Sequence, residues 1–209
     1  MRLDDSGITR LSRRLLSRPE MIGPDTALMP DWMPDSAFDR PPVEAAVLIG
    51  LVRREAGFTV LYTERSSTLR AHSGQVAFPG GKIDPEDEDA AAAALREAHE
   101  EVALAPEEAR ILGFLPHYFT GTNYLITPVV ALVEPSAPFV PNPREVSDVF
   151  EVPLARLARL ETYGTFRIMR GGQERTSYQI DHDGHRIWGI TANLTRRFRD
   201  LALAAELVP

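Results

Sequence analysis

The chain has 209 residues, of which 44% are hydrophobic and 25% charged, a balance typical of a folded globular protein. The net charge of −7 argues against a general nucleic-acid binder, which would carry a basic excess. Because the chain contains no cysteine, disulfides, thiolate metal sites and cysteine nucleophiles are excluded. The length suits one domain, which we place at residues 43–209, with residues 1–42 forming a helix and a proline-rich arm that pack on it.

The sequence favours a cytoplasmic protein with no membrane partner. The apolar run from Ala45 to Val52 is far shorter than the ~20 residues that a membrane helix needs. Asp4-Asp5-Ser6 stands where a secretory signal would be apolar, and the early acids also count against a mitochondrial transit peptide.

The N-terminal segment is expected to hold one short helix. Apolar residues recur at helical spacing and predict an amphipathic helix over residues 6–18. Six prolines between residues 19 and 42 exclude a regular element through most of that arm. The arm could close a pocket, form a homodimer contact or only cover the core.

The first part of the domain is predicted to be a hairpin followed by a long loop. The β-rich runs 43–52 and 59–63 flank a turn-like break. Residues 64–88 are largely irregular apart from a short apolar run, Val76 to Phe78. A loop this long inside a compact domain is usually functional.

A helix is expected next, capped by Asp87 or Asp89 and stopped by Pro106. Its buried stripe is predicted to consist of Ala91, Leu95, Ala98 and Val102.

Alternating strand and helix patterns fill the remainder of the chain. Strands are predicted at 111–115, 125–133, 145–152, 165–169, 175–180 and 186–190, and helices at 154–160 and 191–207. Gly171-Gly172 and Asp183-Gly184 suit hairpin turns. This mixture predicts an α/β (α+β) fold, including the option of a three-layer α/β/α sandwich.

The most informative local pattern is a cluster of carboxylates on the helix after the long loop. Glu97 and Glu101 lie one helical turn apart, with Glu100 beside them. Glu100 can pair with Arg96, but Glu97 and Glu101 have no cation at helical spacing. Like charges this close destabilise a helix by roughly 0.2–0.5 kcal/mol per pair. The spacing alone leaves two readings open, a hard divalent cation and a solvated face.

Gly81, Asp87/Glu88 and the run Arg96-Glu97-Ala98-His99-Glu100-Glu101 together resemble the Nudix box, a glycine–acid–Arg-Glu–Glu-Glu pattern on a loop–helix–loop. The interval from Gly81 to Arg96 is one residue longer than the family pattern, so either Asp87 or Glu88 fills the first acidic position. Ala103 stands where the box usually ends in glycine.

A second resemblance covers Leu61 to Gly81, which is similar to the extra motif of the coenzyme A pyrophosphatase subfamily of Nudix hydrolases. That subfamily shares both departures from the box. The resemblance implies a Nudix-like α/β/α sandwich with a mixed sheet, Mg²⁺ or Mn²⁺ as cofactor, and coenzyme A or acyl-CoA as the small-molecule substrate. The products would be 3′,5′-ADP and (acyl-)4′-phosphopantetheine.

On this reading Glu97 and Glu101 are metal ligands, and Glu100 is a third ligand or the partner of Arg96. The resemblance also offers the carbonyl of Gly81 to the metal. A general base must lie within reach of the attacking water. The resemblance implies Glu145 for this role, because related enzymes often take a further acid from such a downstream loop, with Glu97 as the alternative. A surface carboxylate at the start of a strand is the plainer interpretation of Glu145.

The substrate is expected to contact the long loop. Arg65 and Arg70 can form forked hydrogen bonds to phosphate oxygens, and Gln75 can bind other polar groups. Ordinary surface salt bridges would also explain either arginine.

Two other functions fit the sequence. The same chemistry could act on ADP-ribose, NADH or a dinucleoside polyphosphate, or the chain could be a catalytically silent nucleotide-binding module. The retained Glu97, Glu100 and Glu101 speak against the silent module.

Overall fold

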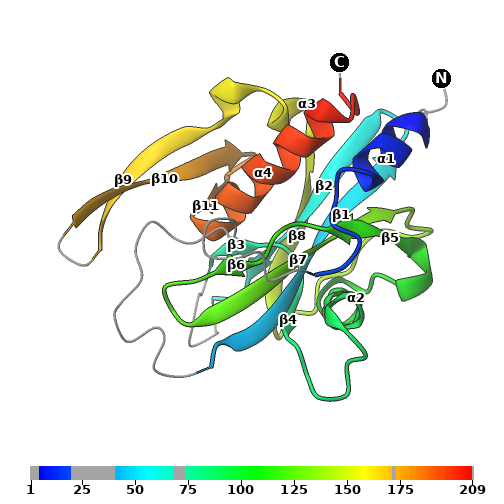
Figure 1. Cartoon of the computed structure of the whole chain (residues 1–209), viewed down its shortest axis with the longest axis horizontal. Helices are drawn as coiled ribbons and strands as arrows, with labels where there is room; N and C mark the ends of the chain where they lie inside the picture. The colour runs from blue at the N-terminus through cyan, green and yellow to red at the C-terminus, as the bar shows by residue number, and fades with distance from the viewer. Residues whose placement is uncertain (1–4, 20–40, 68–73, 171–172, 209) are drawn as a thin grey trace.

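A computed structural model describes residues 5–19, 41–67, 74–170 and 173–208. Its centre is a mixed sheet of eight strands (Figure 1). The strands are β1 Val43–Arg54, β2 Gly57–Arg65, β3 Val76–Ala77, β4 Gly80–Lys82, β5 Ala109–Phe114, β6 Tyr118–Phe119, β7 Tyr124–Val133 and β8 Val146–Pro153.

The main path through this sheet runs β3-β2-β1-β7-β5, with β8 on β2, β4 on β1 and β6 on β7. Strands β1 and β7 are parallel from the Val43–Tyr124 pair to the Val52–Val133 pair, whereas the other pairs are antiparallel. The predicted hairpin is confirmed, since β1 and β2 pair up to Arg54 and Gly57.

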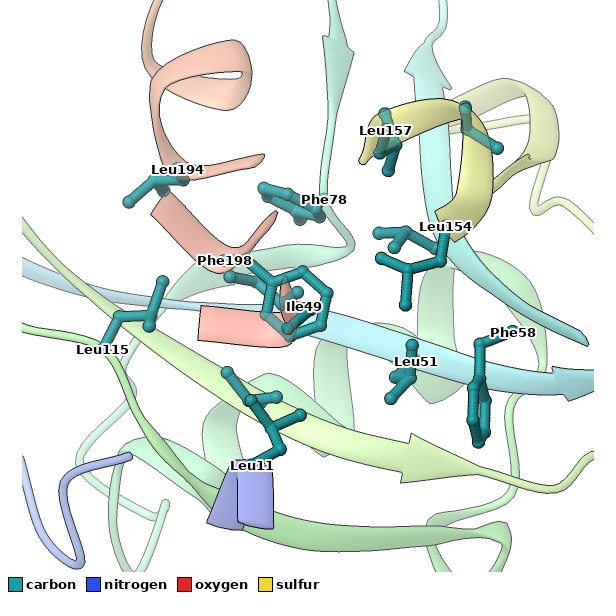
Figure 2. Packing of buried hydrophobic residues seen from close by; sticks show 14 of the residues in the cluster. Leu11, Ile49, Leu51, Phe58, Phe78, Leu115, Leu154, Leu157, Leu194 and Phe198 are labelled. Atoms are coloured by element: carbon teal, nitrogen blue, oxygen red, sulfur yellow. The ribbon is translucent and has the colours of Figure 1, made fainter. Parts of the chain in front are cut away.

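Helices cover both faces of the sheet. One face carries α2 (Ala90–Val102), and the other carries α1 (Asp5–Ser12), α3 (Leu154–Leu157) and α4 (Ile190–Ala204) (Figure 1). Neighbouring residues of a strand point to opposite faces, so Leu48 packs under α2 whereas Ile49 packs in the core below α4. Figure 2 shows this second core, where Leu11 of α1, Phe198 of α4 and Leu154 of α3 meet over the sheet. The predicted mixed-sheet α/β/α sandwich is confirmed.

A second sheet follows in the chain, with β9 (Gly164–Arg170), β10 (Gln173–His182) and β11 (His185–Trp188) all antiparallel. Asp183 and Gly184, at φ 47° and 89°, make the predicted tight turn. Gly171-Gly172 lies outside the described residues. Ile180 and Ile187 are fully buried and tie this sheet to the core below α4.

The predicted N-terminal helix is too long, because α1 ends at Ser12. Leu16 then forms a bridge with Phe114, each backbone N–H donating to the other's carbonyl at 3.0 and 2.9 Å. Leu16, which helical spacing assigned to the helix, therefore pairs with the edge of β5 instead. Most of the arm lies outside the described residues, so the division of the chain at residue 43 stays a prediction.

Helix α2 is turned relative to the predicted stripe. Ala91 and Leu95 are only partly buried, and the buried residues are Ala90, Ala93, Ala94, Ala98, Glu101 and Val102. Small alanines let the helix lie close to the sheet, and one of the glutamates is buried with them. The helix ends at Ala103 in the left-handed conformation (φ 57°), before Pro106 is reached.

The helix predicted at 154–160 is also shorter, because α3 ends at Leu157 and a 3₁₀ turn, η3, spans Leu160–Thr162. A similar turn, η2, spans Pro106–Glu108. Among the described residues, no helix combines the length and the apolar character that crossing a membrane requires.

Candidate active site

The N-terminal end of α2 is fixed by its cap. Asp89 is extended, and its Oδ1 accepts a hydrogen bond of 2.8 Å from the N–H of Ala92. This cap and the buried alanine face set the rotation of the helix, so that Glu97 and Glu101 point toward β4.

Two glycines in β4 let the strand approach these glutamates. A Cβ on Gly81 would lie 2.3 Å from Oε1 of Glu97, and one on Gly80 would lie 2.4 Å from the carbonyl oxygen of Ala46. The N–H of Gly80 donates to Oε2 of Glu101 at 3.2 Å. Only glycine therefore fits between β1 and the two carboxylates.

Arg96 of α2 binds the segment that precedes the helix. Its Nε and Nη2 each lie 3.0 Å from a carboxylate oxygen of Asp87, a forked pair that lowers the pKa of Asp87. Its Nη2 also donates to the carbonyl of Lys82 at 3.2 Å. Asp87 rather than the exposed Glu88 therefore fills the first acidic position beside the helix.

The expectation that Glu97 has no cation is wrong. Nη1 of Arg96 lies 3.0 Å from Oε1 of Glu97 and 3.5 Å from Oε1 of Glu100. Helical spacing missed the first contact because the arginine folds back over the adjacent residue instead of reaching three or four positions along the helix.

Glu145 reaches the same site from the start of β8. The loop before it is tied to the end of α2, where the N–H of Asn142 donates to the carbonyl of Glu101 at 2.8 Å. The carbonyl of Glu145 accepts from the N–H of Ser66 at 2.8 Å. These bonds bring a carboxylate some forty residues distant in sequence beside those of α2.

Glu97, Glu101 and Glu145 form a three-carboxylate cluster, in which one oxygen of each lies within 4.8 Å of those of the other two. No other group of three acidic or histidine side chains this close occurs in the described part of the chain. Hard divalent cations take oxygen ligands, so this donor set fits Mg²⁺ or Mn²⁺. Glu100 lies outside the cluster, about half exposed beside Arg96.

Burial and like charges disfavour ionised carboxylates in this cluster. Glu101 is 3% exposed, and burial followed by the nearby Glu97 and Glu145 raises its pKa to about 8. Burial also raises the pKa of Glu97, which Arg96 partly opposes. A bound cation would remove this penalty.

The raised pKa of Glu101 predicts a pH-dependent stability. Since burial favours its neutral acid, the contribution of Glu101 to stability is present below about pH 4.5 and is lost as the pH rises through about 8. In a chelator, Glu101→Gln should therefore be more stable than the wild type by about 1–3 kcal/mol at pH 8, with a smaller difference at pH 5.

Urea unfolding of both proteins at the two pH values measures this difference. Adding Mg²⁺ should then stabilise the wild type more than the variant. A variant that is less stable than the wild type at pH 8 in chelator would contradict the assignment.

Of the three predicted substrate residues, the structure describes Arg65 and Gln75. Arg65 follows the last buried residues of β2, with its Nη1 3.9 Å from Oε1 of Glu101. Its buried Nε has no hydrogen-bond partner within the described ranges. The backbone of Arg65 bonds to both Gly74 and Gln75, so Gln75 lies at the same edge. Arg70 lies outside the described residues.

Comparison with known proteins identifies the family. The Nudix domain matches residues 42–169, which include β1, α2, the three carboxylates and most of β9. The chain belongs to the Nudix hydrolase family. It is therefore a pyrophosphohydrolase that acts on nucleoside diphosphate derivatives, and enzymes of this family typically use divalent metals.

Two bacterial Nudix hydrolases named NudL are similar over most of their length. The relative from Escherichia coli (strain K12) is 44% identical over 167 residues, and that from Enterobacter sp. (strain 638) is 43% identical over 166. Each match covers 79% of this chain and 84% of the relative. Both relatives are described as uncharacterized, so they support the Nudix family without naming a substrate.

The fold also matches RenU, a Nudix hydrolase from M. smegmatis whose structure has been solved. The TM-score is 0.51 at 21% identity, and the match covers 80% of this chain and 90% of RenU. This likeness supports the Nudix fold.

Proposed function

We propose that this Nudix hydrolase cleaves the diphosphate of coenzyme A or acyl-CoA, releasing 3′,5′-ADP and (acyl-)4′-phosphopantetheine. The observation that carries the proposal is the position of Arg65, a cation at the edge of the three-carboxylate cluster with an unpaired buried Nε among the described residues. Arg65 belongs to the Leu61–Gly81 stretch that resembles the coenzyme A pyrophosphatase motif.

Glu97, Glu101 and Glu145 would hold Mg²⁺ or Mn²⁺, with Glu100 and the carbonyl of Gly81 as further contributors. When bound, the cation supplies Lewis-acid chemistry, neutralising diphosphate oxygens and making water a better nucleophile. Glu101 is the most deeply buried of the three and is held by the N–H of Gly80, so it anchors the set. Arg96 keeps Glu97 in place and balances its charge and that of Glu100.

The proton of the attacking water would pass to a carboxylate at the edge of this cluster. Glu145 is the proposed base because it lies opposite the two helix carboxylates on a separate segment, and no forked pair with an arginine holds it within the described part of the chain. Glu97 is the alternative base, since burial raises its pKa, but its side chain is already engaged by Nη1 of Arg96. Glu100 would assist through Arg96.

Arg65, Arg70 and Gln75 would bind the substrate. A guanidinium can form a forked pair with a phosphate, and Nε of Arg65 is the donor that such a pair would use. The 3′-phosphate of coenzyme A is the group that distinguishes this substrate from ADP-ribose, NADH and dinucleoside polyphosphates. We therefore assign recognition of phosphate groups to these loop residues.

A substrate panel tests this assignment. Coenzyme A, 3′-dephospho-coenzyme A, ADP-ribose and NADH are incubated with Mg²⁺ and the products are separated by chromatography. We expect 3′,5′-ADP from coenzyme A and at least tenfold lower kcat/KM for the dephospho form, because one charge-assisted pair is worth about 1.5–3 kcal/mol.

Arg65→Gln provides the matched test. It should lower kcat/KM for coenzyme A more than for the dephospho form, provided that Arg65 binds the 3′-phosphate. If the wild type turned over coenzyme A and 3′-dephospho-coenzyme A equally, or cleaved ADP-ribose faster, the substrate would be another nucleoside diphosphate derivative and not coenzyme A. No cleavage of any member would favour the silent nucleotide-binding module.

A further inference from the structure

A histidine from the second sheet is bound between two carboxylates of the central sheet. Nδ1 of His185, at the start of β11, lies 2.8 Å from Oε2 of Glu64 in β2. Its Nε2 lies 3.2 Å from Oδ2 of Asp148 in β8. Both ring nitrogens therefore contact a carboxylate, and the imidazole joins strands β2 and β8.

The plane of that ring is fixed by stacking. His185 lies on Phe150 at a centroid distance of 3.8 Å and an interplanar angle of 7°. Phe150 in turn stacks on Tyr62 at 5.6 Å, and the OH of the fully buried Tyr62 lies 2.9 Å from Oγ1 of Thr195. The imidazole is therefore anchored to the rigid core.

The two carboxylates lie next to an irregularity in the β2–β8 ladder. Glu64 pairs with Asp148, but Arg65 pairs with Val146, so Ser147 is an extra residue in β8. The hydroxyl of Ser147 donates to the carbonyl of Glu64 at 3.1 Å. Bulges next to active sites commonly re-aim a side chain. Here the bulge lies directly between the clamped pair and Glu145.

We propose that His185 is a positioning residue, which clamps Glu64 to Asp148 beside the Ser147 bulge and so holds Glu145 and Arg65 in the active site. This inference rests on the proposed roles of those two residues. The clamped residues are connected directly to the active site. Arg65 follows Glu64 in the chain, and the N–H of Ser66 donates a hydrogen bond to the carbonyl of Glu145. Loss of the clamp would let the start of β8 shift relative to β2.

The second sheet does not depend on this contact for its attachment. Ile180 and Ile187 are fully buried in the core below α4, and Thr191 at the start of α4 donates to the carbonyl of Val76 in β3. The clamp instead fixes the position of β2 relative to β8, next to the strand ends that carry Arg65 and Glu145.

His185→Phe tests the clamp while keeping the stacking surface on Phe150. The matched control is His182→Phe, since His182 pairs with His185 across the same hairpin but contacts Asp183 at 3.6 Å. The first readout is Mn²⁺ affinity, measured by electron paramagnetic resonance on the full chain without substrate. We expect about tenfold weaker binding for His185→Phe and less than twofold change for the control.

Asp148→Asn keeps the proposal testable if His185→Phe does not fold, because Asp148 is half exposed and its change removes one side of the clamp. It should weaken Mn²⁺ binding severalfold. With both variants folded, His185→Phe should add little in the Asp148→Asn background, since the two changes break one network. If the two substitutions lowered Mn²⁺ affinity additively, the loss of affinity would have a cause other than the clamp.

Unchanged Mn²⁺ affinity and an unchanged kcat in folded His185→Phe would overturn the positioning role while leaving the proposed function intact. A wild-type chain that binds Mn²⁺ but does not cleave coenzyme A would remove the proposed substrate, and the clamp would still be judged by Mn²⁺ affinity. A wild-type chain that binds no Mn²⁺ would overturn both.

Discussion

Glu101→Gln should lower turnover of coenzyme A by roughly 10³-fold while leaving the fold intact, because removing a group that stabilises transition-state charge costs about 10²–10³ or more. The amide keeps the shape of the side chain, and its oxygen can still accept from Gly80. It cannot supply the negative charge that Glu101 brings to the three-carboxylate cluster. Steady-state kinetics at saturating Mg²⁺ measures the loss.

Glu107→Gln is the matched control. Glu107 is an exposed glutamate one short turn beyond α2, and the same substitution there should change kcat by less than twofold. Near-normal turnover in folded Glu101→Gln would refute its role as a metal ligand, whatever the effect of the control.

Glu145→Gln is expected to lower kcat by about 10²–10⁴-fold, the range that a general base contributes. The change removes the carboxylate that faces the helix pair from β8, and the backbone bonds from Ser66 and Asn142 leave the loop in position. The dependence of rate on Mg²⁺ then separates two roles. Because Glu145 is also proposed to contact the metal, we expect the Mg²⁺ concentration for half-saturation to rise as well; a lower kcat with unchanged half-saturation would leave Glu145 as the base alone.

Glu161→Gln provides the comparison for this change, since Glu161 is exposed in η3 and remote in sequence from the box. If Glu145→Gln altered neither kcat nor the Mg²⁺ dependence, Glu145 would be a surface carboxylate and Glu97 would become the base.

The periodicity of apolar residues and the box motif together predicted most of the elements that carry the site residues. The β1–β2 hairpin, α2 and the closing helix follow from local patterns, which local interactions and one-sided burial enforce. The closeness of Glu97 and Glu101 follows from helix geometry alone. The box also marked Gly81, whose missing side chain makes room for Glu97.

Contacts between distant segments could not be read from those patterns. Arg96 reaches Glu97 because Asp87 and the carbonyl of Lys82 hold its guanidinium beside β4. The end of α1 is decided by β5, through the bridge between Leu16 and Phe114. Each depends on tertiary pairing that overrides local spacing.

The contact of His185 with Glu64 and Asp148 carries no signal in the sequence at all. Its three members are separated by many residues, and although Glu64 lies in the Leu61–Gly81 stretch, no motif links it to Asp148 or His185. By contrast, Glu145 could be proposed from the resemblance, and the structure places its carboxylate beside the two on α2.

Locating Mn²⁺ by anomalous diffraction from crystals of the full chain tests the central claim most directly, because it asks which side chains hold the cation before any substrate is assumed. The account predicts a peak in direct contact with carboxylate oxygens of Glu97, Glu101 and Glu145. A peak that these carboxylates do not contact, in protein that still hydrolyses its substrate, would contradict it.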